Sequence, residues 1–506
     1  MDEIEIGGEK IPEQDWEAAP ASVKRALVNL AEQVKQLSER LAAVEETLNQ
    51  NSSNSSRPPS SDGFAAKPTK APQRRKAKGK QKRPRQVRQL VAVEHCNQVY
   101  EEKPEVCPTC GERLRGEDPH PHRHQVWELP PIQPLVMEYR LHELPCAACG
   151  AKTRARLPGG VSASGNGERL SAVVGLLSGV YRQSHAQVQG LMQEVFGIRL
   201  SYGGVHRLRC EMSEAIRPMV EQAKAYVCQQ PLLHSDETSF PQGNRDGHNP
   251  QARQGWLWVL VTPLMSWFAV VLSRSQETAK HLIGETFDGI VSSDRYGAYG
   301  WIEVTRRQVC WAHLKRDLTA IAQRSGVSQG IGESLLRRQQ RLFRWWYRVR
   351  DGTLSRETFE QMVAHLRAGF KAELETAARL PIGEREKTPL AKTVRTCQKL
   401  LQVEAALWTF VYTPDVEPTN NAAERALRPA VIWRRTSFGS QSEAGSQFVS
   451  RMLTVSTSLK AQNRPVLEAL TQACRAARLG QEPPSLLPET EMLPQPPPVL
   501  LLPQPL

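Results

Sequence analysis

Apolar residues near the start of the chain recur with a heptad spacing. Eight apolar positions follow alternating steps of four and three residues, and charged or Gln side chains fill many of the gaps. This seam predicts a coiled coil over residues 20–50. Because a polar, Pro-rich stretch follows directly, we expect the seam to pair with a second copy, as a homodimer or higher oligomer. The alternative is an amphipathic helix packed on its own domain. The seam comprises Val23, Leu27, Leu30, Val34, Leu37, Leu41, Val44 and Leu48.

A helical periodicity returns in residues 162–228. It predicts helices at 170–181 and 185–196, and a third from Ser201 to about residue 227. A short Gly-containing turn precedes Ser201, so this stretch is a possible helix-turn-helix. An ordinary helical hairpin fits the pattern equally well. The residues that could face DNA are Tyr202, His206, Arg207 and Arg209.

Short apolar runs then change the prediction to strands. They lie at residues 232–238, 255–261, 267–272, 289–294 and 307–311, with a helix at 276–286 and another between the last two strands. The order β-β-β-α-β-α-β predicts an α/β sheet. Asp236 and Asp294 fall at strand ends, where two acids can converge on one site.

A third acid is expected on a helix beyond the fifth strand. In the run PTNNAAER, Thr419 or Asn420 can cap a helix that carries Glu424 in its early turns. Two Asp and one Glu make a hard-oxygen site for two Mg²⁺ or Mn²⁺ ions, which suits phosphoryl transfer. Acids at strand ends are also often caps or members of ion pairs, and spacing alone leaves that alternative open.

Two C-x-x-C-G motifs predict a metal site of another kind. Each pair lets two thiolates from one turn reach one ion, and four cysteines make a closed, structural zinc site. Strand-like runs at His124–Leu129 and Leu135–Leu144 lie between the motifs, so we expect a zinc ribbon over residues 94–158. Cys96 and the nearby histidines are interpreted as non-ligands. The four expected ligands are Cys107, Cys110, Cys146 and Cys149.

Charge points to an anionic partner, nucleic acid first. Lys and Arg outnumber Asp and Glu by 66 to 53, for a net charge of +13. Eleven positive charges and no acidic residue lie between Gly63 and Val93, within a linker, residues 51–93, whose composition predicts disorder. The linker can hold a phosphate backbone without reading sequence, or it is a solvated tether. The residues assigned to DNA contact there are Lys76, Lys78, Arg83 and Arg85.

Other classes of protein are disfavoured. No run of 18 apolar residues occurs and the N-terminus is acidic and polar, which predicts no membrane helix and no signal peptide. Ten cysteines are too sparse for a disulfide scaffold, so a reducing cytoplasm is expected. The Pro-rich residues 481–506 are expected to be a disordered tail.

Several long phrases follow one another along the chain. They are the zipper, NSSNSSRPPSSD, the four-cysteine motif, HSDET, SDRYGAY, CWAH and TNNAAERALRP. In this order they resemble one family: the chain looks like an IS66-family transposase, a DDE enzyme with an RNase H-like core. That resemblance implies that Asp236, Asp294 and Glu424 are the catalytic acids holding two Mg²⁺, and that the partners are element terminal inverted repeats, target DNA and accessory proteins of the element.

The resemblance also divides the catalytic core. Helix-like residues 329–412 resemble an all-helical insertion, which leaves core segments 229–328 and 413–480. Cys310 and His313 resemble a C-x-x-H signature, for which we favour a structural or DNA-proximal role over metal binding. Arginines after the Glu can clamp phosphates, or form surface ion pairs. They are Arg425, Arg428, Arg434 and Arg435.

The expected protein is therefore a multidomain α+β/α chain. Its parts are a coiled coil, a zinc ribbon, a helical DNA-binding region and an RNase H-like core with a helical insertion. The expected activity is cleavage of DNA at element ends and joining of the 3′-OH ends to target DNA, in the bacterial cytoplasm and at the nucleoid. A zinc-ribbon DNA-binding regulator, or a nuclease that cleaves without joining, is the alternative.

Overall fold

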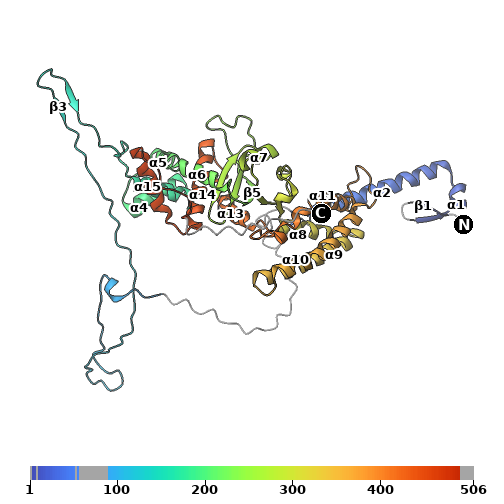
Figure 1. The fold of residues 1–506 in the computed structure, drawn as a ribbon, viewed down its shortest axis with the longest axis horizontal. Coiled ribbons are helices and arrows are strands. Elements are labelled where there is room, and N and C mark those ends of the chain that lie inside the picture. Colours follow the sequence, from blue (N-terminus) through green and yellow to red (C-terminus); the bar gives the residue numbers. More distant parts are fainter. Residues whose placement is uncertain (1–2, 7–8, 49, 52–53, 56–88, 490–506) are drawn as a thin grey trace.

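The computed structural model describes residues 3–6, 9–48, 50–51, 54–55 and 89–489. The fold is mixed α/β, with one five-stranded sheet between two groups of helices (Figure 1). The order across the sheet is β7-β6-β5-β8-β9; the β7-β6-β5 strands are antiparallel neighbours, and β8 and β9 continue parallel to β5. The strands are β5 (Leu232–Ser239), β6 (Trp256–Val261), β7 (Ser266–Val271), β8 (Ile290–Ser293) and β9 (Arg307–Val309).

All five predicted strands of the sheet are confirmed, whereas one predicted helix is wrong. Helix α7 (Gln276–Ile283) forms where expected and ends at Gly284, whose φ of 105° favours glycine. Between β8 and β9 the chain forms only two 3₁₀ turns, η4 (Gly297–Tyr299) and η5 (Val304–Arg306). This connection instead turns back into the core, where Tyr299 is fully buried.

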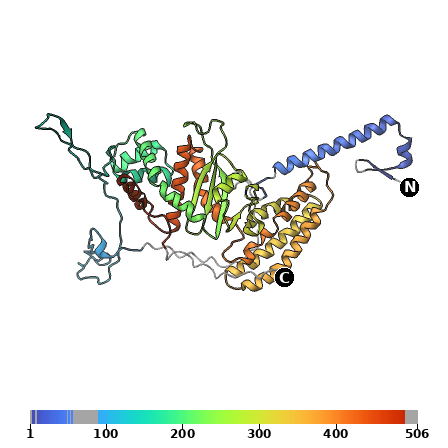
Figure 2. The same ribbon diagram turned by 45° about the horizontal axis from the view of Figure 1, so that its top comes forward.

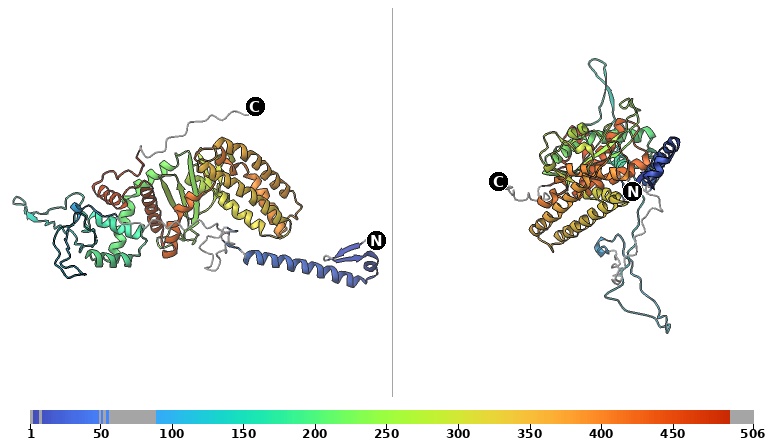
Figure 3. Two further views of the ribbon diagram at one scale, coloured as in Figure 1. Left: turned by 90° about the horizontal axis from the view of Figure 1, so that it is seen from below. Right: turned by 90° about the vertical axis from the view of Figure 1, so that its right-hand side faces the viewer.

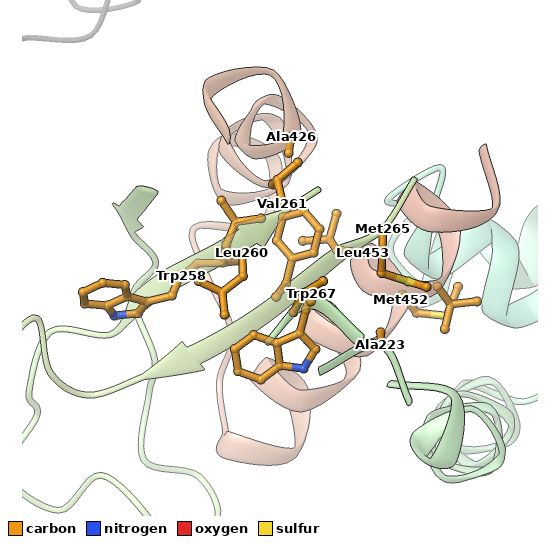
Figure 4. Packing of buried hydrophobic residues seen from close by; sticks show 14 of the residues in the cluster. Ala223, Trp258, Leu260, Val261, Met265, Trp267, Ala426, Met452 and Leu453 are labelled. Atoms are coloured by element: carbon orange, nitrogen blue, oxygen red, sulfur yellow. The ribbon is translucent and has the colours of Figure 1, made fainter. Parts of the chain in front are cut away.

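Apolar residues on both faces of the sheet build the main core. The strand β6, of sequence WLWVLV, is buried along almost its whole length, as expected for a central strand covered on both sides. Figure 4 shows Leu260, Val261 and Trp267 of the sheet beside Ala426 of α13 and Leu453 of α14. The helices around this core are α3 (Glu168–Gly179), α5 (Tyr202–Ala215), α6 (Arg217–Val227), α13 (Asn421–Ser437), α14 (Glu443–Ala461) and α15 (Val466–Leu479). Helix α4 (His185–Phe196) packs on α3 and α5 in a smaller separate cluster.

The helical region before the sheet belongs to this same core. Ala172 of α3 and Met219 of α6 are fully buried in one cluster with the sheet residues. The predicted third helix is interrupted at Ile216, because Pro218 starts a new helix there. Leu486, in the stretch expected to be a disordered tail, is also fully buried in this core; residues 490–506 lie outside the described residues.

A second core holds the helical insertion together. Leu335, Leu342 and Phe370 pack there with Trp311 of α8, which joins the insertion to the end of β9. Figure 2 shows these helices, in yellow and orange, beside the sheet. None of the helices in the described ranges is both long and apolar enough to cross a membrane. The elements are α8 (Trp311–Ala322), α9 (Val327–Arg350), α10 (Arg356–Ala378), α11 (Pro389–Gln402), η6 (Ala405–Leu407) and α12 (Thr409–Tyr412).

The N-terminal heptad region forms one long helix, α2 (Ala21–Leu48). It projects from the end of the molecule that carries the insertion (Figure 3). Its apolar seam faces solvent, with exposed fractions from 38% at Leu27 to 77% at Leu48. Before it lie β1 (Glu3–Ile6), β2 (Glu9–Pro12) and α1 (Glu13–Ala18).

The predicted strands of the zinc ribbon are largely wrong. Residues 124–129 form no strand, and only the end of the second run does, in β3 (Glu143–Pro145), which pairs with β4 (Lys152–Arg154). The remaining regular element is η3 (Val93–His95). No side chain from residue 89 to residue 159 is buried. Apolar alternation forms a strand only where a face can be covered, and nothing in the described chain covers this one.

The insertion depends on one close crossing, between α8 and α9. A Cβ at Gly332 would lie 2.6 Å from the Cα of Ala322, so Gly332→Ala is expected to destabilise the protein by about 1–3 kcal/mol. Gly330, on the same helix, has no atom within 4 Å of the position that a Cβ would take. Gly330→Ala is therefore expected to stabilise the protein by about 0.5–1 kcal/mol, as Ala does in helices. Urea unfolding of both variants measures the difference; equal effects would contradict the close packing.

Candidate active site

Asp236 and Asp294 lie level with each other on neighbouring parallel strands. In the pairing of β5 with β8, His234 lies opposite Ser292. Each aspartate follows two residues later, so the register places the two acids side by side. The prediction that Asp236 ends its strand is wrong, because β5 continues beyond it to Ser239. Asp294 directly follows β8, and its Oδ1 accepts a hydrogen bond from the Tyr296 backbone N–H at 2.8 Å.

Glu424 approaches the two aspartates from the first turn of α13, which packs against β5 and β6. The effect of the Glu424 charge on the pKa of Asp236 shows that the two residues are close. Burial raises the pKa of Asp236 well above its usual value, and the charges of Glu237, Asp294 and Glu424 raise it further. Asp236 therefore lies close enough to the other two predicted acids to be repelled by their charges.

The start of α13 is held by Asn420. Asn420 is the N-cap residue of α13, as predicted, but its side chain makes no capping hydrogen bond to the helix. Its Nδ2 donates to the Ser235 carbonyl at 2.7 Å, and its Oδ1 lies 3.1 Å from the His234 ring nitrogen Nδ1. Its backbone N–H donates to the Cys310 Sγ at 3.1 Å. One buried residue thus joins the Glu helix to β5 and to the start of α8.

The C-x-x-H motif is adjacent to Glu424. Ligand atoms of Cys310, His313 and Glu424 all lie within 4.8 Å of one another, whereas the three acids form no such group among the described residues. Glu424 Oε1 is 3.7 Å from His313 Nδ1 and 3.5 Å from Arg316 Nη2. Burial lowers the pKa of His313 and raises the pKa of Cys310 to about 11. A neutral thiol is a poor metal ligand, so this geometry favours a positioning role for the motif.

The donor set of the three acids fits a hard divalent cation. Carboxylate oxygens are the ligands that Mg²⁺ and Mn²⁺ prefer. The raised pKa of Asp236 means that its ionised form lacks a nearby positive charge, which a bound dication would supply. The residues that would hold such ions are Asp236, Asp294 and Glu424.

A second network, which sequence reasoning missed, braces the two strand ends. Glu237 is buried; its Oε1 accepts from Arg274 at 2.7 Å and its Oε2 from the Tyr299 hydroxyl at 2.6 Å. The Arg274 guanidinium also stacks 3.6 Å from the centre of the Tyr296 ring. The loop that follows Asp294 is therefore fastened to the strand that carries Asp236. The adjacent acids in HSDET were the available signal, since strand alternation sends Glu237 to the other face.

The arginines after Glu424 differ in what they can reach. Arg425 and Arg428 are exposed on α13 and make no ion pair with a described residue. Arg434 is committed to the protein, because its Nη1 donates to the hydroxyl of Thr238 at 3.0 Å and also binds Ser239. Arg435 is exposed. Arg425 and Arg428 can thus reach a phosphate, as the predicted clamp requires, whereas the hydrogen bonds of Arg434 hold its side chain against β5.

The proposed DNA-facing residues of the helix-turn-helix divide in the same way. Tyr202, His206 and Arg207 are exposed on α5. Arg209 points inward instead, with its guanidinium 4.3 Å from the centre of the Phe448 ring. The linker residues Lys76, Lys78, Arg83 and Arg85 lie outside the described residues.

The four cysteines form two separate turns. In the first, the Gly111 N–H donates to the Cys107 carbonyl at 2.9 Å; in the second, the Gly150 N–H donates to the Cys146 carbonyl at 2.8 Å. Backbone N–H groups of each turn lower the pKa of Cys107 and Cys146, which favours the thiolate that binds metal. The structure does not bring the four thiols, including Cys110 and Cys149, into one group of ligand atoms within 4.8 Å.

Comparison with known proteins shows the family of the chain. Residues 175–448, more than half of the chain, match the model of the transposase IS66 family. The chain belongs to the IS66 transposase family. Residues 9–89 match a second family model, described as a family of unknown function, DUF6444. The IS66 match covers both aspartates, Glu424 and the C-x-x-H motif.

Two similar proteins come from Sinorhizobium fredii (strain NBRC 101917 / NGR234), and both are described as uncharacterized. The protein y4qI is 26% identical over 263 residues, which are 47% of this chain and 46% of that protein. The protein y4hP is 24% identical over 403 residues, 72% of this chain and 68% of that protein. The chain thus spans less than half of the first relative and about two thirds of the second.

The repulsion at Asp236 predicts a gain in stability when its charge is removed. Asp236→Asn is expected to raise the free energy of unfolding by about 0.5–2 kcal/mol in metal-free buffer at pH 8. The pKa of Asp236 is higher in the folded chain than in the unfolded chain. The folded state therefore holds this proton more tightly, and stability falls as the pH rises through the folded-state pKa.

The stabilisation should accordingly be largest at high pH and vanish below about pH 3.9, the usual pKa of an unfolded Asp. Urea unfolding at a series of pH values measures it. The exposed Asp288 provides the control, because Asp288→Asn removes the same charge away from the site. A stability gain that does not change with pH, or one that Asp288→Asn reproduces, would contradict the assignment.

Proposed function

We propose that this member of the IS66 family is a DDE transposase that cuts DNA at element ends and joins the ends to target DNA. The observation that carries the proposal is the level placement of Asp236 and Asp294 on parallel strands, with Glu424 held over them by Asn420. The sheet order supports an RNase H-like core: three antiparallel strands followed by two parallel ones. The family itself implies that DNA is processed.

Each reaction exchanges one phosphorus–oxygen bond for another. In cleavage, the oxygen of water attacks phosphorus, and the bond to the 3′ oxygen breaks to leave a 3′-OH and a 5′-phosphate. In joining, that 3′ oxygen loses its proton and attacks a target phosphodiester, releasing the 3′-OH of the target strand. Two Mg²⁺ or Mn²⁺ ions on the acids would activate the attacking oxygen and stabilise the leaving one.

Other residues would orient the carboxylate of Glu424 or contact the DNA. His313 and Arg316 lie beside Glu424 and orient its carboxylate. Arg425 and Arg428 lie on the exposed side of the same helix, where guanidinium groups bind phosphate oxygens in two places at once. The exposed seam of α2 would pair two chains, so that two DNA ends are held together. We place the reaction in the bacterial cytoplasm, at the nucleoid.

The chemistry is tested with labelled DNA from the two flanks of the gene, a target plasmid and Mg²⁺. Asp294→Asn and Glu424→Gln are expected to reduce both cleavage and joining by about 10³-fold or more. Asp288→Asn, a charge removal outside the site, should leave both rates within about twofold. Cleavage without any joined product would identify a nuclease instead, and binding without either product would favour a regulator.

We also propose that Cys107, Cys110, Cys146 and Cys149 hold one structural Zn²⁺. The pre-formed turns and the lowered pKa of Cys107 and Cys146 support it, and a region with no buried side chain gains stability from such a crosslink. Purified full-length protein is expected to carry about one zinc per chain. Cys149→Ser should lose it, while Cys96→Ser should keep it. Retention of zinc by Cys149→Ser, measured by metal analysis, would overturn the assignment.

A further inference from the structure

A pocket of about 510 Å³ opens between the insertion and the catalytic core. Its walls come from α8, α9 and the residues where α13 begins. Ala312 is the neighbour of His313 in the chain, and Asn421 lies one turn before Glu424. The pocket therefore lies next to the three acids, but none of the acids lines it. It is lined by Trp311, Ala312, Lys315, Gln339, Gln340, Phe343, Arg344, Tyr347, Thr419 and Asn421.

One side of the pocket is aromatic. The rings of Trp311 and Phe343 meet edge to face with centres 6.3 Å apart, and those of Phe343 and Tyr347 at 6.2 Å. Trp311 is fully buried and anchored by its indole N–H, whereas Tyr347 is 57% exposed. Trp311 therefore supports Phe343 from beneath, and the half-buried Phe343 and the exposed Tyr347 supply the aromatic surface on which a flat heterocycle can stack.

A buried amide in the pocket has no partner. Gln339 is only 5% exposed, and its side chain makes no hydrogen bond to any residue that the structure describes. Buried amides are nearly always paired, so an unpaired one needs an explanation. An amide offers a donor and an acceptor together, which match the edge of a nucleobase. Gln340 and Asn421 add two further amides to the lining.

The charge of the pocket is of one sign. Lys315 and Arg344 line it and are exposed, and neither side chain forms an ion pair with a described residue. No acidic residue is among the ten that line it. The pocket thus combines a stacking surface, hydrogen-bonding amides and two cations, which are the groups that bind a base and its phosphate.

We propose that this pocket receives one unpaired nucleotide of the DNA end, with its base against the aromatic side and its phosphate near Lys315 and Arg344. The proposal rests on the proposed function, because it is the acids beside the pocket that make a DNA end the natural ligand. It deepens that function by assigning the insertion a role: the insertion supplies α9, and with it the site that holds the end once it is unstacked. Extruding a base from a duplex costs stacking energy, so an end that is already unpaired binds more readily.

The test measures binding without cleavage. Full-length protein, in buffer without added divalent cations, is titrated with a blunt duplex and with the same duplex carrying a two-nucleotide single-stranded end that contains 2-aminopurine. We expect the unpaired end to bind about tenfold more tightly than the blunt end and its fluorescence to be quenched by stacking. Free deoxyadenosine monophosphate, added as a competitor at the concentration of the DNA, should displace neither.

Substitutions assign the preference to the pocket. Gln339→Leu keeps the side-chain volume, and Arg344→Ala alters an exposed residue, so neither is expected to unfold the protein. Each should reduce the preference for the unpaired end about fivefold or more while leaving blunt-end binding within twofold. Arg337→Ala, also exposed on α9 but outside the pocket, is the matched control and should keep the preference.

Three outcomes would overturn the proposal: equal binding of both duplexes, an unchanged preference in Gln339→Leu and Arg344→Ala, or displacement of the DNA by the free mononucleotide. The last would assign the pocket to a free nucleotide. Because no bond is cut in this assay, its result is independent of the cleavage test. A protein that cuts and joins DNA but shows no preference for unpaired ends would retain the proposed function and lose only this site.

Discussion

The hydrogen bonds of Asn420 are the constraint on which the arrangement of the site depends. This fully buried residue connects β5, the start of α8 and the start of α13, three segments that are far apart in the chain. Leaving one of its buried partners unpaired would cost about 1–3 kcal/mol. Since Glu424 lies in the first turn after it, these bonds set both the depth and the rotation at which that carboxylate meets the sheet. The arrangement also places like charges together, so stability is given up locally at the site where we propose that cations bind.

The insertion is attached to the site through α8 and the residues around it. Trp311 follows Cys310 directly, lies in the core of the insertion and donates its indole N–H to the Leu407 carbonyl. Its backbone N–H donates to the Pro418 carbonyl, just before α13. A displacement of the insertion would therefore be transmitted to the Glu helix through backbone contacts. This coupling gives a physical reason for so large an insertion between a strand and the helix that completes the site.

The strands of the sheet could be predicted from the sequence because most of them are short apolar runs, and burial on both faces is what such runs require. The two aspartates followed from that pattern. Glu424 was a candidate from its position after a helix cap, and the resemblance to a family phrase strengthened that choice. The contacts of Asn420, Glu237 and Arg274 could not be predicted, because a local cap is the default for Asn and long-range partners leave no mark in spacing. The prediction of strands around His124 was wrong because the apolar alternation is present but no other part of the described chain covers the apolar face.

The separation of the acids along the chain has a consequence during synthesis. Asn420 and its partner Ser235 are 185 residues apart. At 5–20 residues per second, a ribosome needs about 10–40 s to pass from one to the other. Once Val309 has been made, the nascent chain has its N-terminal helix and all five strands of the sheet but still lacks Asn420 and Glu424. A chain that stops early, through a nonsense codon or a frameshift in the insertion, would lack α13 and α14, which pack on the sheet, together with Glu424, Arg425 and Arg428. Truncated copies of the gene are then expected to yield chains whose sheet is left partly uncovered.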